Sequence, residues 1–279
     1  MVVPIVLYGS EIWAHHDNLI EMVERLQLKF CKYLLKAKPS TPTCMVRGEC
    51  GIYPLRNKIR YNIMAFWTRI LCGKQSKLIY QMYCALHQLH SDKMYTSPWI
   101  ANVKRVLEMC GFPIIWIRQS EIDRAVKAKI LYLIQSSLDD QFIQEFHFSI
   151  QNSPSCILYK FIKTDFGLEP YLNSLSDVYR TTLCKLRLSN NKLEVTKGRY
   201  NGTPRINRLC RSCNSSKIGD EYHLIFECDK FQTLRDKYIL NYFTKRPNMY
   251  KVCNLINMKQ NATNNFKFVK FIHECFRLL

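Results

Sequence analysis

Four metal-ligating residues in the last third of the chain constrain its fold more than any other feature. They are Cys210, Cys213, His223 and Cys228, spaced Cys-x2-Cys, nine residues, His, four residues, Cys. A Cys-x2-Cys turn offers two thiolates, and the imidazole and a third thiolate complete a tetrahedron. Four protein ligands leave no open position, so the spacing predicts a structural zinc ion rather than one that activates water. The alternative is that these are ordinary members of a chain with 13 cysteines.

The residues that lead into this motif are strongly basic. Between positions 185 and 211 a single acid, Glu194, stands among eight cations: Lys185, Arg187, Lys192, Lys197, Arg199, Arg205, Arg208 and Arg211. Tyr200 and several asparagines lie between them and can stack on bases or hydrogen-bond to them. The pattern favours contact with phosphates of a nucleic acid, although such a run can also be a solvated surface.

Composition places the chain among folded basic proteins. It has 279 residues, 47% of them hydrophobic, and a formal net charge of +19. This charge indicates a polyanionic partner, either nucleic acid or an anionic membrane surface. Of these two we expect RNA or DNA and no membrane. We expect no secretory leader in the apolar start of the chain, because it lacks a basic segment and a cleavage site. The cysteines are then reduced, and the protein is expected to be intracellular, in the nucleus, the cytoplasm or both.

The N-terminal part predicts one short strand followed by helices. Residues 2–8 have the pattern of a short buried strand, whose partner we expect upstream of this chain. Positions 17–38 predict a helix with a buried stripe comprising Ile20, Val23, Leu26 (or Gln27), Phe30 and Leu34. The same helix should carry a basic ridge that follows a phosphate backbone, formed by Arg25, Lys29, Lys32 and Lys36.

Two further helices are expected before residue 75. A short one covers positions 44–49 and ends at Gly51, and a longer one follows Pro54 and is terminated by Gly73. Arg56 and Arg60 lie one turn apart on the longer helix. Positions 25–77 hold twelve Lys or Arg and one acid, Glu49, so these helices could bind a nucleic-acid duplex. The alternative is a basic helical bundle with no binding function.

The remaining pattern is also helical, which makes the expected fold class mainly α. Helices are predicted at 76–89, 98–110, 121–138, 176–188, 230–243 and 264–276, with an irregular segment at 151–172. Asp139 and Asp140 superficially resemble a polymerase carboxylate pair. They follow a helical pattern without an apolar strand, so we interpret them as a helix end without catalytic function.

Several blocks, taken in order, resemble a known family. They are Tyr8-Gly9-Ser10-Glu11-Ile12-Trp13, Leu26-Gln27-Leu28-Lys29-Phe30-Cys31-Lys32, Ser40-Thr41-Pro42, Arg47-Gly48-Glu49-Cys50-Gly51-Ile52-Tyr53-Pro54-Leu55, Phe66-Trp67, Leu186-Arg187-Leu188 and Lys197-Gly198-Arg199-Tyr200, followed by the cysteine–histidine motif. This order is similar to the C-terminal part of the reverse transcriptase polyprotein of non-LTR (LINE-type) retrotransposons, over nearly the whole chain.

The resemblance implies a domain organisation. It predicts a thumb-like basic helical region at 1–110, a helical linker at 111–180, a CCHC-type zinc-knuckle module at 181–245 and a C-terminal helical segment at 246–279. The implied function is binding of element RNA, target DNA or both, with Cys210, Cys213, His223 and Cys228 as zinc ligands. The polymerase carboxylates and the endonuclease residues of the family are absent, so we expect a fragment that lacks its upstream reverse transcriptase domain and is not an enzyme.

Two alternatives to nucleic-acid binding remain open at this point. The chain is either a zinc-stapled structural or protein-interaction module, or an inactive retroelement relic. An enzyme is disfavoured because no nucleophile motif, glycine-rich phosphate loop or paired-carboxylate signature occurs.

Overall fold

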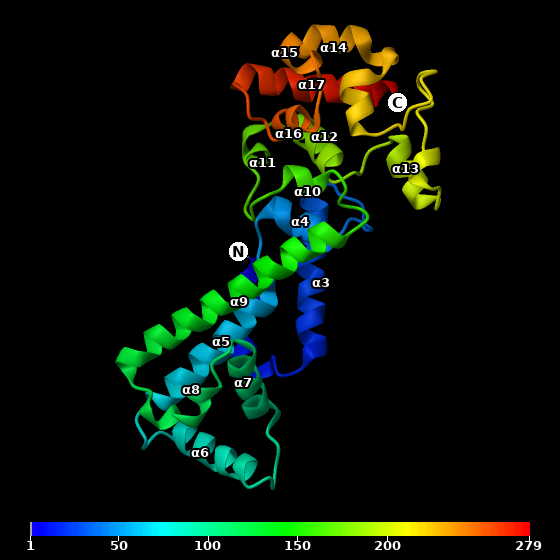
Figure 1. The fold of residues 1–279 in the computed structure, drawn as a ribbon. Coiled ribbons are helices and arrows are strands. Elements are labelled where there is room, and N and C mark those ends of the chain that lie inside the picture. The colour runs from blue at the N-terminus through cyan, green and yellow to red at the C-terminus, as the bar shows by residue number, and fades with distance from the viewer. Residues whose placement is uncertain (1) are drawn as a thin grey trace. The chain divides into compact units, whose positions relative to one another are not determined.

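The computed structural model describes residues 2–279, and these residues are mainly α-helical (Figure 1). In chain order the helices are α1 (Val2–Val6), α2 (Ser10–Trp13), α3 (Asp17–Leu34), α4 (Thr43–Cys50), α5 (Leu55–Leu71), α6 (Leu78–Ser91), α7 (Pro98–Met109), α8 (Pro113–Ile117), α9 (Arg124–Asn152), α10 (Tyr159–Ile162), α11 (Tyr171–Ser174), α12 (Asp177–Arg187), α13 (Glu194–Tyr200), α14 (Gln232–Tyr238), α15 (Asn241–Thr244), α16 (Met249–Ile256) and α17 (Ala262–Leu278). Shorter turns are η1 (Gln119–Glu121), η2 (Arg205–Asn207), the π-helix η3 (His223–Glu227) and η4 (Asp229–Phe231). Extended pairing among the described residues is confined to isolated bridges, Cys50–Leu168 and Leu209–Ile218.

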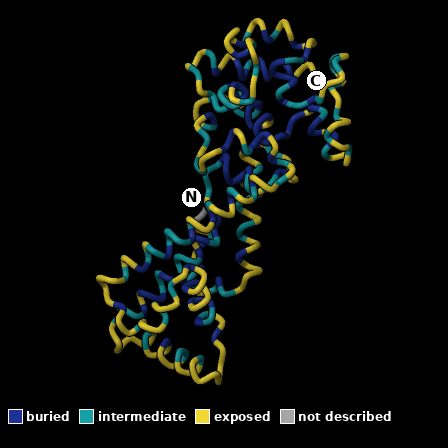
Figure 2. Tube along the Cα trace, in the orientation of Figure 1, coloured by how far each residue is buried: buried dark blue, intermediate teal, exposed yellow. Residues whose placement is uncertain are grey.

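The chain forms two compact units that do not follow the four expected segments. Among the described residues, unit 1 comprises 2–28 and 53–146, and unit 2 comprises 29–52 and 147–279. Unit 2 therefore contains the cysteine–histidine motif and also the early segment that includes α4. Each unit has buried positions of its own (Figure 2).

The core of unit 1 is built from apolar stripes with helical spacing. On α5, Ile59, Ile63 and Trp67 are fully buried, and they belong to one cluster with residues such as Val103 of α7 and Ile134 of α9. The indole of Trp67 donates a hydrogen bond to the Tyr83 hydroxyl at 3.0 Å, so the polar end of this large side chain is satisfied where it is buried.

The core of unit 2 includes the helix pairs α12–α17, α14–α17 and α10–α16. Phe268, Phe271 and Ile272 of α17 are buried with exposed fractions of 1% or less, as their helical spacing predicts. Because α14 follows the cysteine–histidine motif directly, its packing on α17 ties that motif to the C-terminal helix.

Most predicted helices are confirmed, and their ends follow local stop signals. Gly51 terminates α4 in the left-handed conformation, with φ of 60° and its N–H bonded to the Arg47 carbonyl. Gly111 follows α7 with φ of 81°. The helices expected at 176–188 and 264–276 correspond to α12 and α17.

Several expectations are wrong. Residues 2–8 contain α1 and not a strand, so the argument for a missing upstream sheet partner no longer holds. Asp139 and Asp140 lie inside α9, which continues to Asn152, and are not a helix end. The helix expected at 230–243 is interrupted, because Ile239 is extended (φ −104°, ψ 130°) between α14 and α15.

The stripe predicted on α3 is wrong in its C-terminal half. Phe30 and Leu34 are 51% and 56% exposed, whereas Cys31 and Leu35 are buried at 3% and 5%. The buried face therefore lies one residue further along than predicted. The helix also ends at Leu34, and Lys36 beyond it has a positive φ of 49°.

Candidate metal centre and its basic surroundings

The Cys-x2-Cys turn is held by a short hairpin-like pairing. Leu209 and Ile218 form an antiparallel bridge. Around it the Cys210 N–H donates to the Lys217 carbonyl at 2.8 Å, and the Gly219 N–H donates to the Arg208 carbonyl at 2.9 Å. The six residues between Cys210 and Lys217 make the turn that carries Cys213, so backbone hydrogen bonds alone bring the two thiols to one end of the hairpin.

The other two ligands come from the irregular helical segment that follows. His223 begins the π-helix η3, and Cys228 comes directly after its end. The Asp220 carboxylate accepts from the His223 backbone N–H at 3.0 Å and so caps this segment. The π-helical turn and the extended Cys228 (φ −67°, ψ 118°) place the imidazole and the last thiol beside the hairpin.

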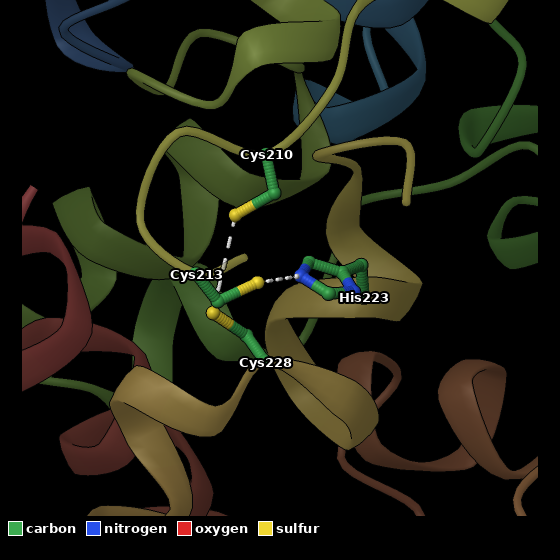
Figure 3. A group of neighbouring side chains, drawn as sticks. All are labelled: Cys210, Cys213, His223 and Cys228. Carbon is green, nitrogen blue, oxygen red and sulfur yellow. Dashed lines mark hydrogen bonds between the residues drawn. The ribbon is translucent and has the colours of Figure 1, made fainter. Parts of the chain in front are cut away.

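The four ligand atoms are grouped as a metal site requires (Figure 3). They all lie within 4.8 Å of one another; Cys213 Sγ is 3.2 Å from His223 Nε2, and Cys210 Sγ is 4.0 Å from Cys228 Sγ. A tetrahedron with metal–sulfur bonds of about 2.3 Å has sulfur–sulfur edges of about 3.8 Å. The spacing in the protein fits this geometry, so the Cys3His cluster could hold a metal ion.

A carboxylate orients the imidazole from its other side. Glu227 Oε2 lies 3.2 Å from His223 Nδ1, which leaves Nε2 facing the three thiols. Carboxylate support of this kind fixes the ring and raises its basicity at metal sites. Lys217 pairs with the same carboxylate group at 3.1 Å, so the carboxylate that supports the imidazole has a cationic partner of its own. Sequence spacing did not indicate Glu227; its position four residues after His223 is the signal that could have found it.

The pKa values of two of the thiols, Cys213 and Cys228, are shifted in opposite directions by their surroundings. Burial raises the pKa of Cys213, but hydrogen bonds with Ser215, His223 and Cys210 lower it overall to about 6. Burial and the neighbouring thiols Cys210 and Cys213 raise the pKa of Cys228 to about 12. A bound divalent metal would deprotonate such thiols outright, because its charge exceeds these local effects.

Arg235 of α14 connects the motif to the rest of unit 2. Its guanidinium is buried and donates to the carbonyl oxygens of Ile225 and Cys228 at 2.8 and 2.9 Å. These carbonyls lie in η3 and at the last ligand. A single buried side chain therefore satisfies the backbone of the metal-binding segment and attaches it to the helix that packs on α17.

The prediction that Arg187 contacts nucleic acid is wrong. Its side chain is wholly buried, and its guanidinium is ion-paired with Glu49 and Glu169 at 3.0 and 2.9 Å. A side chain enclosed in this way has no surface to offer a phosphate. Sequence reasoning placed it among exposed cations because its buried partners come from distant parts of the chain.

The other cations of this stretch are accessible to different degrees. Lys185, Lys197 and Arg211 are exposed, and the last two share the Glu194 carboxylate at 2.8 and 3.5 Å. Arg208 donates to the carbonyls of Thr203 and Val195. These Arg208 contacts hold the backbone without neutralising the guanidinium charge.

Arg199, Arg205 and Arg208 line a cavity of about 190 Å³ in unit 2. Arg205 is ion-paired with Asp220 at 2.8 Å. Arg199 lies near the carbonyl oxygens of Ser155 and Ser189, at 3.5 and 3.3 Å. Within residues 2–279, Arg199 and Arg208 have no carboxylate ion-pair partner, although Asp220 and Glu221 also line this cavity.

Tyr200, at the end of α13, lies among cations as predicted. Its ring is 47% exposed, with Lys38 Nζ 4.6 Å and the Arg199 guanidinium 5.3 Å from the ring centre, and its hydroxyl is 3.2 Å from Ser40 Oγ. Burial raises the pKa of Tyr200, but the hydrogen bonds with Ser40 and Arg199 and the charge of Lys38 lower it overall. Sequence reasoning missed Lys38, because only folding brings it to Tyr200.

The predicted ridge on α3 is not a continuous set of free cations. Arg25 pairs with Glu21 at 2.9 Å and Lys36 with Asp177 at 2.5 Å, and Lys36 lies beyond the helix end. Lys32 donates to the Pro39 carbonyl at 2.5 Å, and burial lowers its pKa. Lys29 is exposed.

The two arginines predicted to contact nucleic acid from α5, Arg56 and Arg60, are also influenced by other charged residues of unit 1. Arg56 forms an ion pair with Glu145. Burial and the charges of Arg56 and Arg105 lower the pKa of Arg60. Both arginines are only partly accessible, so they are less available than an exposed basic face would be.

Searches against models of protein families, curated proteins and solved structures found no match to this chain. Within residues 2–279, no helix has the length and apolar character needed to cross a membrane.

Proposed function

We propose that this chain is a non-catalytic nucleic-acid-binding protein whose Cys210, Cys213, His223 and Cys228 hold a structural zinc ion. The observation that carries the proposal is the position of Tyr200. Tyr200 is about half exposed, on the helix that precedes the Cys3His cluster, and both Lys38 and Arg199 lie close to its ring. Aromatic rings stack on unpaired bases, and cations beside them bind the phosphates.

Zinc is the metal that suits this donor set best. Three thiolates and one imidazole form a soft, tetrahedral, closed set, which is typical of structural zinc sites. With no open position, the ion would maintain the shape of the loop and would not take part in a reaction. The role of the metal is then to hold residues 208–228 rigid next to the exposed cations Lys197 and Arg211.

We also propose that the chain corresponds to the C-terminal region of a LINE-type reverse transcriptase. Two blocks that carry this resemblance meet in the core of unit 2, because Glu49 of one is ion-paired with Arg187 of the other. This contact gives both blocks a role in the packing of unit 2. In such a protein the region would bind element RNA, target DNA or both.

A zinc-stapled structural or protein-interaction module, or an inactive relic, is the second candidate. It is favoured by the number of predicted contact residues that serve the fold itself. Arg187 is buried, Arg205 is paired with Asp220, and Arg208 holds backbone carbonyls. This candidate predicts a bound zinc ion and no preference for polyanions.

Binding of labelled single-stranded RNA and of duplex DNA across a salt series separates the candidates. For the proposed function, the logarithm of affinity falls linearly with the logarithm of salt concentration. The Cys210→Ser/Cys213→Ser double variant should bind more weakly. Tyr200→Ala should weaken single-strand binding by at least about 5-fold, whereas Tyr250→Ala, on an exposed tyrosine of α16, should not.

A charge variant completes the test. Lys197→Gln should reduce the slope for single strands by about 0.7, while Lys267→Gln, on an exposed lysine of α17, is the matched control. Absence of salt-dependent binding by the unmodified chain would exclude the proposed function. Binding that is indifferent to Tyr200 and to the metal ligands would show that the metal only staples the fold and that the nucleic acid binds elsewhere on the chain.

A further inference from the structure

A groove between α5 and α9 of unit 1 contains none of the residues that the sequence singled out. Figure 1 shows these two helices side by side, and the Asn57 side chain joins them by donating to the Leu138 carbonyl at 2.9 Å. The groove has a volume of about 590 Å³ and is lined by Lys58, Tyr61, Arg124, Lys127, Ala128, Leu131, Tyr132 and Gln135. Its α9 residues recur every three or four positions, so they form one face of the helix.

The charge of this groove has one sign. It is lined by three cations and by no carboxylate. Within residues 2–279, Lys58, Arg124 and Lys127 take part in none of the ion pairs of the protein. This differs from Arg25, Lys36 and Arg56, each of which has an acidic partner. The positive potential of the groove is therefore not cancelled locally.

Aromatic rings lie between these cations. Tyr132 is 72% exposed, which is unusual for a large ring on a helix face next to a core. Lys58 Nζ lies 4.6 Å from the centre of the Tyr61 ring. The small, exposed Ala128 and the partly buried Leu131 line the same groove as the two tyrosines. Unneutralised cations alternating with accessible rings are what a single nucleic-acid strand requires.

We propose that the groove formed by Lys58, Tyr61, Arg124, Lys127 and Tyr132 binds single-stranded nucleic acid, with the tyrosines stacking on bases and the cations contacting phosphates. The proposal rests on the proposed function for the class of ligand, but it concerns a different surface. It adds a contact in unit 1 that needs neither the metal nor Tyr200.

The test uses the full chain and a fluorescein-labelled oligouridylate of about 12 nucleotides, a length suited to a groove of this kind. Tyr132→Ala should weaken binding by at least about 5-fold, and Lys127→Gln should lower the salt slope by about 0.7. Tyr95→Ala and Lys129→Gln are matched controls, because both residues are exposed in unit 1 and neither lines the groove. Unchanged thermal midpoints would show that all four variants fold.

The outcomes separate this inference from the proposed function. Weakening by Tyr132→Ala and Lys127→Gln but not by the controls, also in the Cys210→Ser/Cys213→Ser chain, supports the groove. Weakening only by Tyr200→Ala overturns the groove and leaves the proposed function intact. If the chain binds phosphatidylserine vesicles through Lys127 and Tyr132 but binds neither the oligouridylate nor duplex DNA, both proposals are wrong, because the partner is then a lipid surface.

Discussion

Arg187 and Glu49 form an ion pair in which neither side chain is exposed to solvent. The Arg187 Nε lies 3.1 and 3.0 Å from the two Glu49 oxygens, and its Nη1 donates to Asn257 Oδ1 at 2.8 Å. The Tyr171 hydroxyl donates to Glu49 Oε2 at 2.5 Å. Burial alone lowers the pKa of Arg187, but Glu49 and Glu169 raise it above its usual value overall. The arginine is thus a permanent cation at the centre of unit 2.

Replacing Arg187 should lower the free energy of unfolding of unit 2. Arg187→Gln leaves the Glu49 carboxylate buried without its partner, and breaking a buried pair of this kind costs about 3–5 kcal/mol. Arg25→Gln is the matched control, because the Arg25–Glu21 pair is exposed and such pairs contribute about 0–1 kcal/mol. Urea unfolding followed by circular dichroism measures both. Equal free energies of unfolding for the two variants would contradict the burial of Arg187.

Gly51 should not tolerate any side chain. It has φ of +60°, and a Cβ atom placed on it would lie 2.2 Å from the backbone nitrogen of Leu168. Gly51→Ala should therefore lower the free energy of unfolding by several kcal/mol. The left-handed conformation accounts for about 1–2 kcal/mol of this loss, and the clash with the backbone adds the rest. Gly202→Ala isolates the first contribution, because Gly202 has φ of +67° and no atom within 4 Å of an added Cβ. The melting temperatures of the two variants should differ clearly; similar values would show that the bridge at Leu168 is not formed.

The Cys3His cluster should bind one equivalent of zinc. Cys213→Ser should abolish tight binding, while Cys84→Ser, at an exposed cysteine, should leave it unchanged. Glu227→Gln should weaken zinc affinity by about 10- to 100-fold, because the Glu227 carboxylate contacts His223 Nδ1 and orients the imidazole. Competition with a chromogenic chelator gives these affinities. A stoichiometry near zero for the unmodified chain would exclude the site.

Loss of the metal should destabilise more of unit 2 than the metal-binding segment alone. The sequence suggests that Cys213→Ser unfolds residues 197–243 and leaves the preceding helices intact. The packing of α14 on α17 extends this expectation to α17, because Arg235 of α14 also supports the metal segment. Hydrogen exchange should therefore rise in α14 and α17 and stay low in α5. Uniform loss of protection over the whole chain would argue against this division.

Stability at high pH should depend on Tyr83. Burial raises the pKa of Tyr83 to about 12, despite the opposing hydrogen bond with Trp67, from an ordinary value of 10.0. A folded-state pKa above the unfolded one means that the contribution is complete below about pH 10 and is lost as pH rises through about 12. Tyr83→Phe should flatten this fall, whereas Tyr95→Phe, at a tyrosine 52% exposed, should not. Urea unfolding at pH values from about 9 to 12 measures the slope, and an unchanged slope in Tyr83→Phe would contradict the burial of its hydroxyl.

The sequence by itself determined the features that depend on near neighbours in the chain. The helices around Ile59, Ile63 and Trp67 follow from spacing on one face, and Gly51 and Gly111 end helices for local steric reasons. The Cys3His cluster was predictable for the same reason, because a hairpin turn and one irregular helical turn bring Cys210 and Cys228 together over a short distance.

Only the tertiary structure decided which charges face solvent. Arg187 and Lys185 look alike in the sequence, yet one is buried against Glu49 and the other is exposed. The main partner of Arg187, Glu49, lies more than a hundred residues away in the chain, and the same is true of Lys38 beside Tyr200. A cation's partner is set by which helices pack together, and a local pattern carries no information about that packing because burial energy depends on the sum of all contacts.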